Sequence, residues 1–432
     1  MGFFYTDAEA ASLHEHAGRI VAADPARAQR GRLNSNVAVP DPKSGKEVND
    51  RTPVPMGKRR PMVWRTYREQ DIHAAVDAAG LGSFTATYLY AHPEGLFSLQ
   101  ERSGADPLPR SGQPFAPHLP REFAEFCRRM DDVELPGGRD AVVPLASDSI
   151  AHLRTYSPSY SGRQHAPRTS ADYAHLMACE LEADVHLMLG RDNNLARLVG
   201  VSAELADHAR GYLTDLPDYP LKPTHPDMHS DNLGVRNGHL FVYDLELVGY
   251  HDRRHAVAYA ALNSRTTEFH KAATAEVVKT VPRPDREGFV EGLRAWHCFA
   301  TLQSTATRVN RAEEAVRGAA LTGGDVERTL NRFAPWLADR VNTAAPLWNS
   351  ARTVDVTEVR AALAETARLQ EERRLSREAG PPVGTAAIGM GGPVSRRTPQ
   401  CRDNARPVLP AEPAAPLRPR SADHDRRCAR EP

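Results

Sequence analysis

The chain has 432 residues, of which 55 are Lys or Arg and 55 are Asp or Glu, so its formal net charge is zero. This balance gives no overall attraction to nucleic acid or to an anionic membrane, and we expect neither as a partner. The N-terminus lacks a secretory pattern and no apolar run reaches about 18 residues, so we expect a cytoplasmic protein; its oligomeric state stays open.

The first 68 residues predict an irregular N-terminal extension. A short amphipathic helix fits residues 8–23, but from Gly31 to Arg60 the chain is rich in Pro, Asn, Asp and Gly and shows little periodicity. Segments of this kind favour loops over packed elements.

Residues 69–156 predict a small nucleotide-binding lobe that is built on an antiparallel sheet. Apolar side chains recur at helical spacing over 70–79, and two glycines then stop the helix. Two apolar runs, 84–91 and 96–99, flank a Pro-Glu-Gly turn and predict paired strands. A second helix is expected over 121–130, followed by short strands near 142–145 and 150–156.

Residues 157–379 predict a larger α-helical lobe for catalysis and acceptor binding, with helices over 170–189, 202–213, 325–340 and 355–376. The last segment, 380–432, is rich in Pro and Arg and has almost no large apolar side chains, so we expect a disordered tail. The whole chain is therefore predicted to be an α+β protein with two lobes.

One segment within the helical lobe carries a chemical motif. His225, Asp227 and Asn232 have the spacing H-x-D-x-x-x-x-N. The Asn237-Gly238 pair lies between two apolar runs, which is a strong signal for a β-hairpin. Such a hairpin would fold Asp244, at the end of its second strand, back beside Asn232.

This group of side chains suits phosphoryl transfer from ATP to a hydroxyl. Asp227 would orient the hydroxyl and take its proton, while Asn232 and Asp244 would offer the oxygen ligands that Mg²⁺ prefers. His225 is expected to act as a scaffold residue of the catalytic loop by bonding the backbone near Asp244.

The segment resembles the catalytic and metal loops of the aminoglycoside phosphotransferase and choline kinase superfamily, whose motif is H-G-D-x-H-x-x-N followed by an apolar strand and D-[FW]-E. His229 matches the second histidine and Glu246 the trailing acid. The resemblance implies a two-lobed protein kinase-like fold, with a small antiparallel-sheet lobe and a larger helical lobe, and ATP bound at a hinge near residues 154–157.

The sequence departs from this family at the phosphate-binding lysine, because no lysine occurs between Lys58 and Lys222. Gln100 stands at the expected place on a strand of the small lobe, and Arg102 points to the same face two residues later. Arg102 is therefore predicted to bind the phosphates in place of lysine, with Glu122 or Glu125 as its ion partner.

A second departure lies after the metal loop, where the family has an aspartate that braces the catalytic loop. His255 stands at that position, so the brace is either rebuilt by an imidazole or weakened.

Three functions remain open from the sequence. The leading hypothesis is an ATP-dependent O-phosphotransferase that acts on a small hydroxylated molecule, such as an aminoglycoside-like or sugar-like acceptor. The second is a kinase for Ser or Thr of a precursor peptide, which the N-terminal extension would dock. The third is a nucleotide-binding pseudokinase without turnover, suggested by the missing lysine and by His255.

Overall fold

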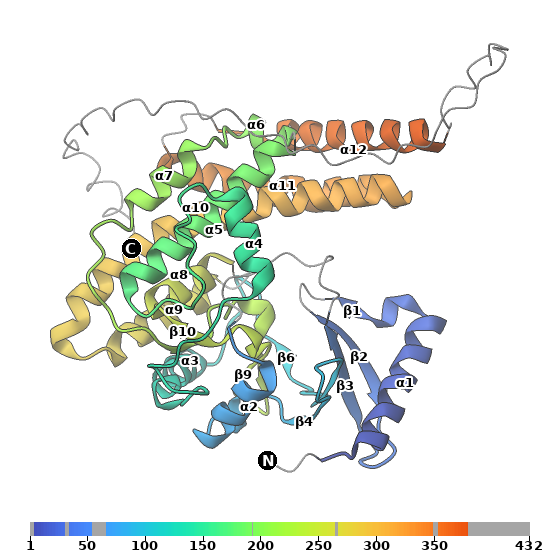
Figure 1. Cartoon of the computed structure of the whole chain (residues 1–432), viewed down its shortest axis with the longest axis vertical. Helices are drawn as coiled ribbons and strands as arrows, with labels where there is room; N and C mark the ends of the chain where they lie inside the picture. Colours follow the sequence, from blue (N-terminus) through green and yellow to red (C-terminus); the bar gives the residue numbers. More distant parts are fainter. Residues whose placement is uncertain are drawn as a thin grey trace, which may run out of the picture.

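The computed structural model describes residues 4–30, 34–53, 66–191, 193–263, 267–348 and 353–378. These residues form a small lobe with a β-sheet and a larger lobe made mostly of helices (Figure 1). The predicted disordered tail, residues 380–432, lies outside the described residues.

The small lobe is built around a five-stranded antiparallel sheet with the strand order β1-β2-β3-β5-β4. Strand β3 lies at its centre and pairs with β2 on one side and with β5 on the other. The bounds of the strands are Gln29–Arg30 for β1, Asn34–Pro40 for β2, Glu47–Pro53 for β3, Tyr88–Ala91 for β4 and Ser98–Glu101 for β5.

The prediction of an irregular extension over residues 1–68 is therefore wrong for its described part. Strands β2 and β3 form a hairpin whose turn is closed by the Asp41 N–H, 2.7 Å from the Lys46 carbonyl oxygen. Gly45 takes a positive φ of 69° in this turn. The strands are rich in Asn and Asp, which have low β propensity, and they are held by pairing with the distant β5, which local patterns do not reveal.

Helix α1 (Asp7–Ala23) packs on this sheet and confirms the helix expected over 8–23. It begins with a capping box formed by Thr6 and Glu9. Its buried face meets apolar side chains of the sheet, and this small core comprises Tyr5, Ala10, Leu13, Ala17, Val37, Val39, Val48, Tyr90, Phe97 and Leu99. Helix α1 lies at the outer edge of the small lobe (Figure 1).

The predicted boundary at residue 156 is also corrected, because two segments assigned to the small lobe pack elsewhere. Helix α3 (Leu119–Arg129) packs on α9 (Thr267–Thr280) in the helical part. Residues 150–156, predicted as a strand, belong to helix α4 (Ser147–Tyr156), which packs on α5 (Ser170–Gly190). A short segment with apolar residues at 150 and 153 fits either structure, and tertiary packing decides between them.

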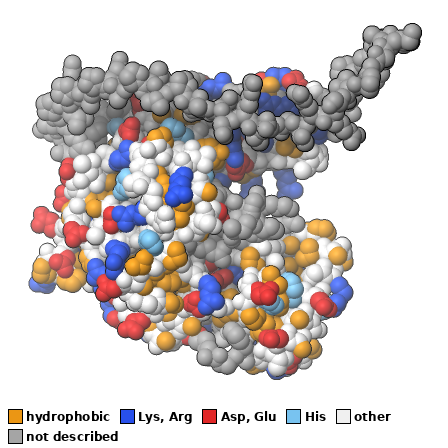
Figure 2. Space-filling model, viewed as in Figure 1, with side chains coloured by type: hydrophobic (Ala, Val, Ile, Leu, Met, Phe, Trp, Pro, Cys, Tyr) orange, Lys and Arg blue, Asp and Glu red, His pale blue; other side chains and the backbone are white. Residues whose placement is uncertain are grey.

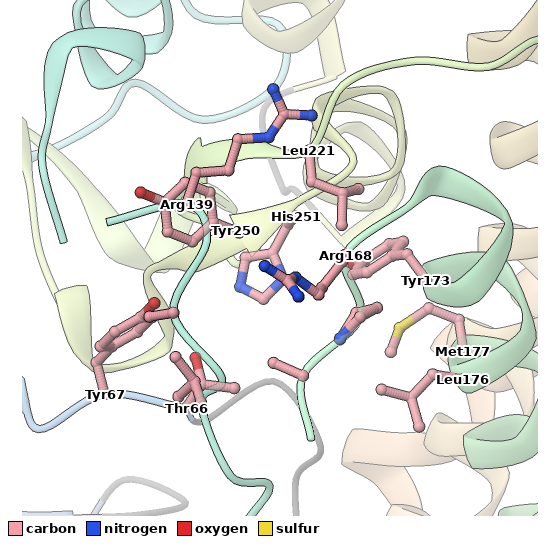
Figure 3. A pocket seen from close by; sticks show the side chains of 14 residues that line it. Thr66, Tyr67, Arg139, Arg168, Tyr173, Leu176, Met177, Leu221, Tyr250 and His251 are labelled. Carbon is pink, nitrogen blue, oxygen red and sulfur yellow. The ribbon is translucent and has the colours of Figure 1, made fainter. Parts of the chain in front are cut away.

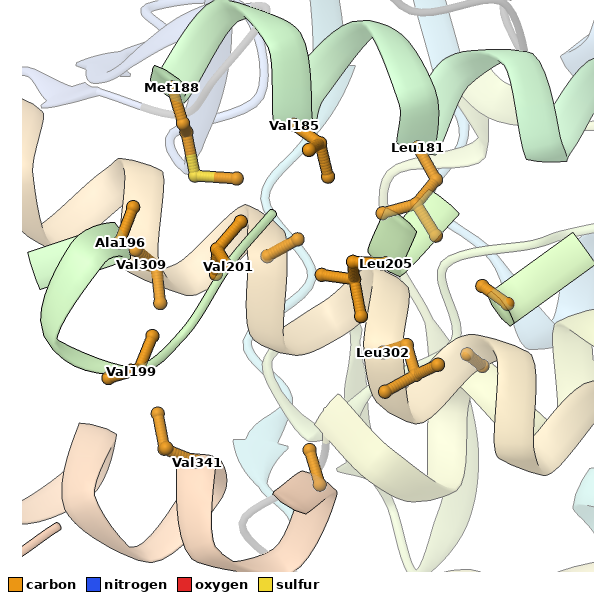
Figure 4. Close-up of a cluster of buried hydrophobic side chains, with 14 of the residues drawn as sticks. Leu181, Val185, Met188, Ala196, Val199, Val201, Leu205, Leu302, Val309 and Val341 are labelled. Atoms are coloured by element: carbon orange, nitrogen blue, oxygen red, sulfur yellow. The ribbon is translucent and has the colours of Figure 1, made fainter. Parts of the chain in front are cut away.

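The core of the helical lobe forms around the 37-residue helix α10 (Arg286–Thr322). Apolar side chains from α5, α6, α7, α10 and α11 meet in one cluster, which includes Val185, Leu205, Leu302 and Val341 (Figure 4). The remaining helices are α2 (Glu69–Ala78), α6 (Asn194–Leu198), α7 (Glu204–Gly211), α8 (Arg253–Asn263), α11 (Val326–Ala344) and α12 (Val356–Glu378).

The strands β6 to β10 form two small sheets. Strands β7 (Lys222–Thr224) and β10 (Gly249–His251) form an antiparallel pair, and β8 (Leu233–Arg236) and β9 (His239–Val242) form a hairpin with β6 (Asp106–Pro107) beside it. The hairpin predicted from Asn237-Gly238 is confirmed, with positive φ at both residues.

The surface carries both signs of charge. Acidic and basic side chains are interspersed over the face shown in Figure 2, as the zero net charge leads one to expect. Among the described residues, the helices are too short or too polar to cross a membrane.

Candidate active site

The predicted catalytic loop follows β7, the strand that begins at Lys222. His225 is fully buried, and its Nε2 lies 2.9 Å from the carbonyl oxygen of Tyr243, the residue before Asp244. Because a carbonyl can only accept, Nε2 donates, and Nδ1 then accepts from the Asp227 N–H at 3.4 Å. This is the backbone contact that was predicted for His225.

Asn232 connects Asp227 to the hairpin. Its Nδ2 donates to the Asp227 carbonyl oxygen at 2.8 Å and lies 3.4 Å from Asp227 Oδ2. Its own carbonyl oxygen accepts from the Tyr243 N–H at 2.9 Å. Since the amide nitrogen is used in this way, Oδ1 of Asn232 remains as the atom that can bind a metal ion.

Asp244 lies two residues after the end of β9, so the hairpin returns it to the side of Asn232. Its backbone is left-handed, with φ 60° and ψ 51°. Asp is among the few non-glycine residues that adopt this conformation with some frequency. The loop and the hairpin thus bring Asp227, Asn232 and Asp244 to one place.

A buried arginine from the small-lobe sheet contacts Asp244 at this site. Arg51 lies on β3 and is only 8% exposed; its Nε is 3.0 Å from Glu69 Oε2 at the start of α2. The same guanidinium forms an ion pair with Asp244 and lies 3.2 Å from Glu246 Oε2. Asn34, from β2, also donates to Glu246. Residues of both lobes therefore meet at Arg51.

Glu69 is held in position by further polar groups. Its Oε1 accepts from Gln100 Nε2, on β5, at 3.1 Å, and His73 Nε2 lies 3.9 Å away. Burial lowers the pKa of His73 to about 4, so this ring is neutral near pH 7. Gln100, predicted at the phosphate-binding position, thus contacts Glu69, the partner of Arg51.

Charges and burial act in opposite directions at this site. Burial by itself raises the pKa of Asp244, but the positive charge of Arg51 outweighs it and the pKa is lowered. Burial lowers the pKa of His225, against the opposing effect of Asp227. Asp244 is therefore ionised and His225 neutral near pH 7, the protonation states that metal binding and the His225 hydrogen bonds require.

His229 contacts the Asp227 carboxylate. Its Nδ1 accepts from the Asp231 N–H at 3.1 Å, so the proton of the neutral ring is on Nε2, which lies 3.5 Å from Asp227 Oδ1. The second histidine of the motif is thus placed to orient the carboxylate of the first aspartate.

The predicted ion pairing of Arg102 is wrong. Arg102 is half exposed and pairs with Glu47 on the neighbouring strand. Glu122 instead accepts from the Leu240 N–H and contacts His239, while Glu125 pairs with Arg128 one turn along α3. The helix that carries the two glutamates packs in the helical lobe, away from the strand of Arg102.

A sequence signal for Arg51 did exist. Residues 34–40 and 47–53 are of equal length around an Asp-Pro-Lys-Ser-Gly turn, and a helix with an acidic first turn follows at Glu69. The polar composition of the two strands concealed the hairpin.

The position of the expected brace is occupied by a buried histidine. His255 Nδ1 lies 2.9 Å from the Tyr173 hydroxyl, and its Nε2 lies 3.1 Å from Gln303 Oε1. The buried Asp252, three residues earlier, accepts from Arg254, Ser170 and Trp296. These bonds tie the segment after β10 into the helical core.

Among the described residues, two cavities lie in the region of Thr66 and Tyr67, and neither lining includes Asp227, Asn232 or Asp244. A cleft of about 570 Å³ lies between the lobes and is lined by Arg51 and Glu69 on one side and by residues 144–146 on the other. A second cavity of only about 30 Å³ lies beside β10, where His251 points inward among Tyr67, Tyr250 and Arg168 (Figure 3). The second volume suits a water molecule, and only the first suits a nucleotide or an acceptor.

The strand order, the cation on the central strand paired to a helix glutamate, and the Asp-Asn-Asp set together define a two-lobed protein kinase-like fold. The predicted fold class is confirmed, but the hinge is not near residues 154–157, since these end helix α4 and begin the loop after it. The chain passes from the sheet to the helical lobe between β5 and α3.

Solved structures of this fold type are similar to the chain. The ADP-bound aminoglycoside phosphotransferase APH(2'')-Ib is 12% identical, with a TM-score of 0.44, and the match covers 79% of this chain and 99% of that one. A choline/ethanolamine kinase family protein from Mesorhizobium loti is 13% identical, with a TM-score of 0.42 and coverage of 83% and 99%. An ethanolamine kinase from Plasmodium vivax is 11% identical, with a TM-score of 0.39 and coverage of 80% and 82%.

No protein-family model and no curated protein sequence matches the chain. At these identities and TM-scores the likeness concerns the arrangement of the chain and assigns no activity, so the function has to be argued from the site.

Proposed function

We propose that the protein is an ATP-dependent O-phosphotransferase that transfers the γ-phosphoryl group to a hydroxyl of a small hydroxylated molecule. The observation that carries the proposal is the convergence on Arg51, which joins the Glu69 side chain at the start of α2 to the Asp244 carboxylate after the hairpin. A cation paired in this way is the phosphate-binding device of kinase-like enzymes.

In this proposal Asp227 is the catalytic base. Its carboxylate orients the acceptor hydroxyl and takes its proton as the acceptor oxygen bonds to the γ-phosphorus; the bond from that phosphorus to the bridging oxygen breaks, and ADP leaves. His229 Nε2, 3.5 Å from Asp227 Oδ1, holds the carboxylate in place. His225 positions the loop against Asp244 through the Tyr243 carbonyl.

Arg51 would bind the phosphates. Its guanidinium stays charged, and the neighbouring carboxylates raise its pKa further in spite of burial. Glu69 and Gln100 fix its direction, so little rotamer freedom remains to be lost on binding.

The donor set at the hairpin fits magnesium. Asn232 Oδ1 and the Asp244 carboxylate are hard oxygen ligands of the kind that Mg²⁺ takes together with phosphate oxygens. When bound, Mg²⁺ would neutralise charge that develops on the phosphate oxygens. We propose the cytoplasm, which supplies ATP and Mg²⁺, as the location.

The structure bears on both alternative functions. The pseudokinase hypothesis depended largely on the missing lysine, and Arg51 offers a cation at the corresponding place. The N-terminal extension was offered as a segment that would suit peptide docking, but residues 34–53 form a hairpin of the small-lobe sheet. Both observations favour the small-molecule phosphotransferase.

The test is an assay of ADP release by the full-length protein with ATP, Mg²⁺ and a panel of hydroxylated metabolites. We expect acceptor-dependent ADP release that Asp227→Asn abolishes while ATP still binds. A wild-type protein that binds ATP but transfers phosphate to no acceptor, precursor peptides included, would support the pseudokinase. Release that is equal in Asp227→Asn would exclude the assigned base.

A further inference from the structure

A group of metal-binding side chains lies at the tip of the β8–β9 hairpin. His118 directly precedes α3, Glu122 is in its first turn, and His239 begins β9 after the Asn237-Gly238 turn. One nitrogen or oxygen atom from each of the three lies within 4.8 Å of the other two. Positions four apart at the start of a helix share a face, which brings His118 and Glu122 together.

The side chains are already oriented by hydrogen bonds. Glu122 Oε2 accepts from the Leu240 N–H at 2.7 Å, which fixes the carboxylate and leaves Oε1 directed at His239 Nδ1, also 2.7 Å away. His118 Nε2 lies 2.8 Å from the Gly238 carbonyl oxygen. Because that carbonyl can only accept, Nε2 donates to it, and this hydrogen bond ties the His118 ring to the hairpin tip.

The donor set selects a class of metal. Two imidazoles and one carboxylate are the ligands of many open zinc sites, in which water occupies the fourth position. Mg²⁺ and Ca²⁺ prefer oxygen ligands alone, so this group differs in kind from Asn232 and Asp244. A metal ion here would replace the proton that His239 and Glu122 share, as expected for ligands that must be deprotonated.

The geometry permits coordination after a small adjustment. Bonds of about 2.0–2.1 Å in a tetrahedron place ligand atoms roughly 3.4 Å apart, so no pair has to approach by more than roughly 1.4 Å. His239 is 72% exposed and can rotate, whereas Glu122 is only 22% exposed and acts as the fixed ligand. An ion can reach the site directly from solvent.

We propose that His118, Glu122 and His239 bind a divalent transition metal ion of the Zn²⁺ class and that the ion links α3 to the hairpin tip. The hairpin carries Asn232 at one end and Asp244 at the other, so the link would restrain the element that supports the candidate active site. This inference stands independently of the proposed phosphotransferase activity.

The test uses Co²⁺ as a spectroscopic probe and Zn²⁺ in calorimetry, both on full-length protein stripped of metal. We expect a d–d absorption without thiolate charge transfer, and a Zn²⁺ affinity that falls at least tenfold in His239→Ala and in Glu122→Gln. His165→Ala, which removes an exposed histidine from another loop, is the matched control and should bind as wild type does. A large excess of Mg²⁺ should not compete.

Thermal melting separates site loss from misfolding. Zn²⁺ should raise the melting temperature of wild type and of His165→Ala but not that of His239→Ala, whose melting temperature without metal should equal that of wild type. If His239→Ala does not fold, Glu122→Gln and His118→Asn give the same comparison. The proposal is overturned if wild type binds no transition metal, or if the site variants and His165→Ala bind it equally.

Discussion

The sharpest consequence of the structure concerns Arg51, which we expect to be required both for nucleotide binding and for stability. In Arg51→Met the aliphatic stem is largely kept and the charge is removed. Glu69 and Glu246, which are 10% and 4% exposed, would then be buried without their counter-ion. Removing one partner of a buried ion pair costs about 3–5 kcal/mol of unfolding free energy.

The effect should depend on pH with a defined sign. In wild type the pKa of Asp244 is lowered, so this group contributes stability above its unfolded pKa that is lost as the pH falls through its folded pKa. In Arg51→Met the largest influence that lowers the pKa of Asp244 is lost, while burial still raises it, so protonation of Asp244 at low pH removes part of the cost of the substitution. The difference in stability between the two proteins should be largest near neutral pH and shrink below about pH 4.

The control is Arg102→Met. Arg102 lies at the end of the neighbouring strand β5, is 51% exposed and pairs with the partly exposed Glu47. A surface pair of this kind contributes about 0–1 kcal/mol. Arg102→Met should therefore keep the wild-type urea midpoint and ADP release, while Arg51→Met loses roughly 10²–10³-fold in turnover, the usual loss for one charge-stabilising donor.

The assays are urea unfolding followed by fluorescence, ATP binding by calorimetry, and ADP release. Arg51→Lys keeps the charge but replaces the planar guanidinium, whose Nε and Nη2 contact different carboxylates, by one compact ammonium, so its turnover and stability should lie between those of wild type and Arg51→Met. The reasoning is refuted if Arg51→Met unfolds at the wild-type urea concentration and binds ATP normally, or if Arg102→Met is the more damaging change.

Three further predictions concern single side chains. Asp227→Asn should abolish phosphoryl transfer and leave the ATP dissociation constant within about threefold of wild type, since the base acts only on the acceptor. A large increase in the ATP dissociation constant would contradict this. Asp244→Asn should weaken ATP binding in Mg²⁺ much more than in EDTA, which paired titrations measure. Burial lowers the pKa of His270 to about 3, so its contribution to the unfolding free energy should fall by roughly 3 kcal/mol from pH 6.5 to pH 4. His270→Phe should therefore make the melting temperature less dependent on pH over this range. An unchanged dependence of the melting temperature on pH would rule out His270 as the cause.

What the sequence predicted well depends on short-range structure. The Asn237-Gly238 turn determines its hairpin from neighbouring residues, and the hairpin places Asp244 beside Asn232 only 12 residues away in the chain. The helices predicted over 170–189, 325–340 and 355–376 were found for the same reason, because a stripe of apolar side chains is a local signal.

The features that the sequence did not reveal depend on contacts between residues that are far apart in the chain. Arg51 is 18 residues from Glu69 and 193 residues from Asp244, and the strand that carries it is held by β5. A polar strand with Asn and Asp acquires its structure from its partners in the sheet, so its own composition indicated a loop. The sequence therefore predicted the phosphate-binding cation at Arg102, the residue after strand β5.

The position of Arg51 has a consequence for how the molecule opens. Arg51 belongs to the small-lobe sheet, whereas Asp244 and Glu246 follow the β8–β9 hairpin, so one guanidinium connects the sheet to the end of the hairpin. A phosphate that binds this guanidinium has to compete for it with the carboxylates of Asp244 and Glu246. Phosphate binding and separation of the small-lobe sheet from the hairpin would then both depend on Arg51. A higher ionic strength weakens partly exposed charge pairs and should therefore make the pair between Arg51 and Asp244 easier to break.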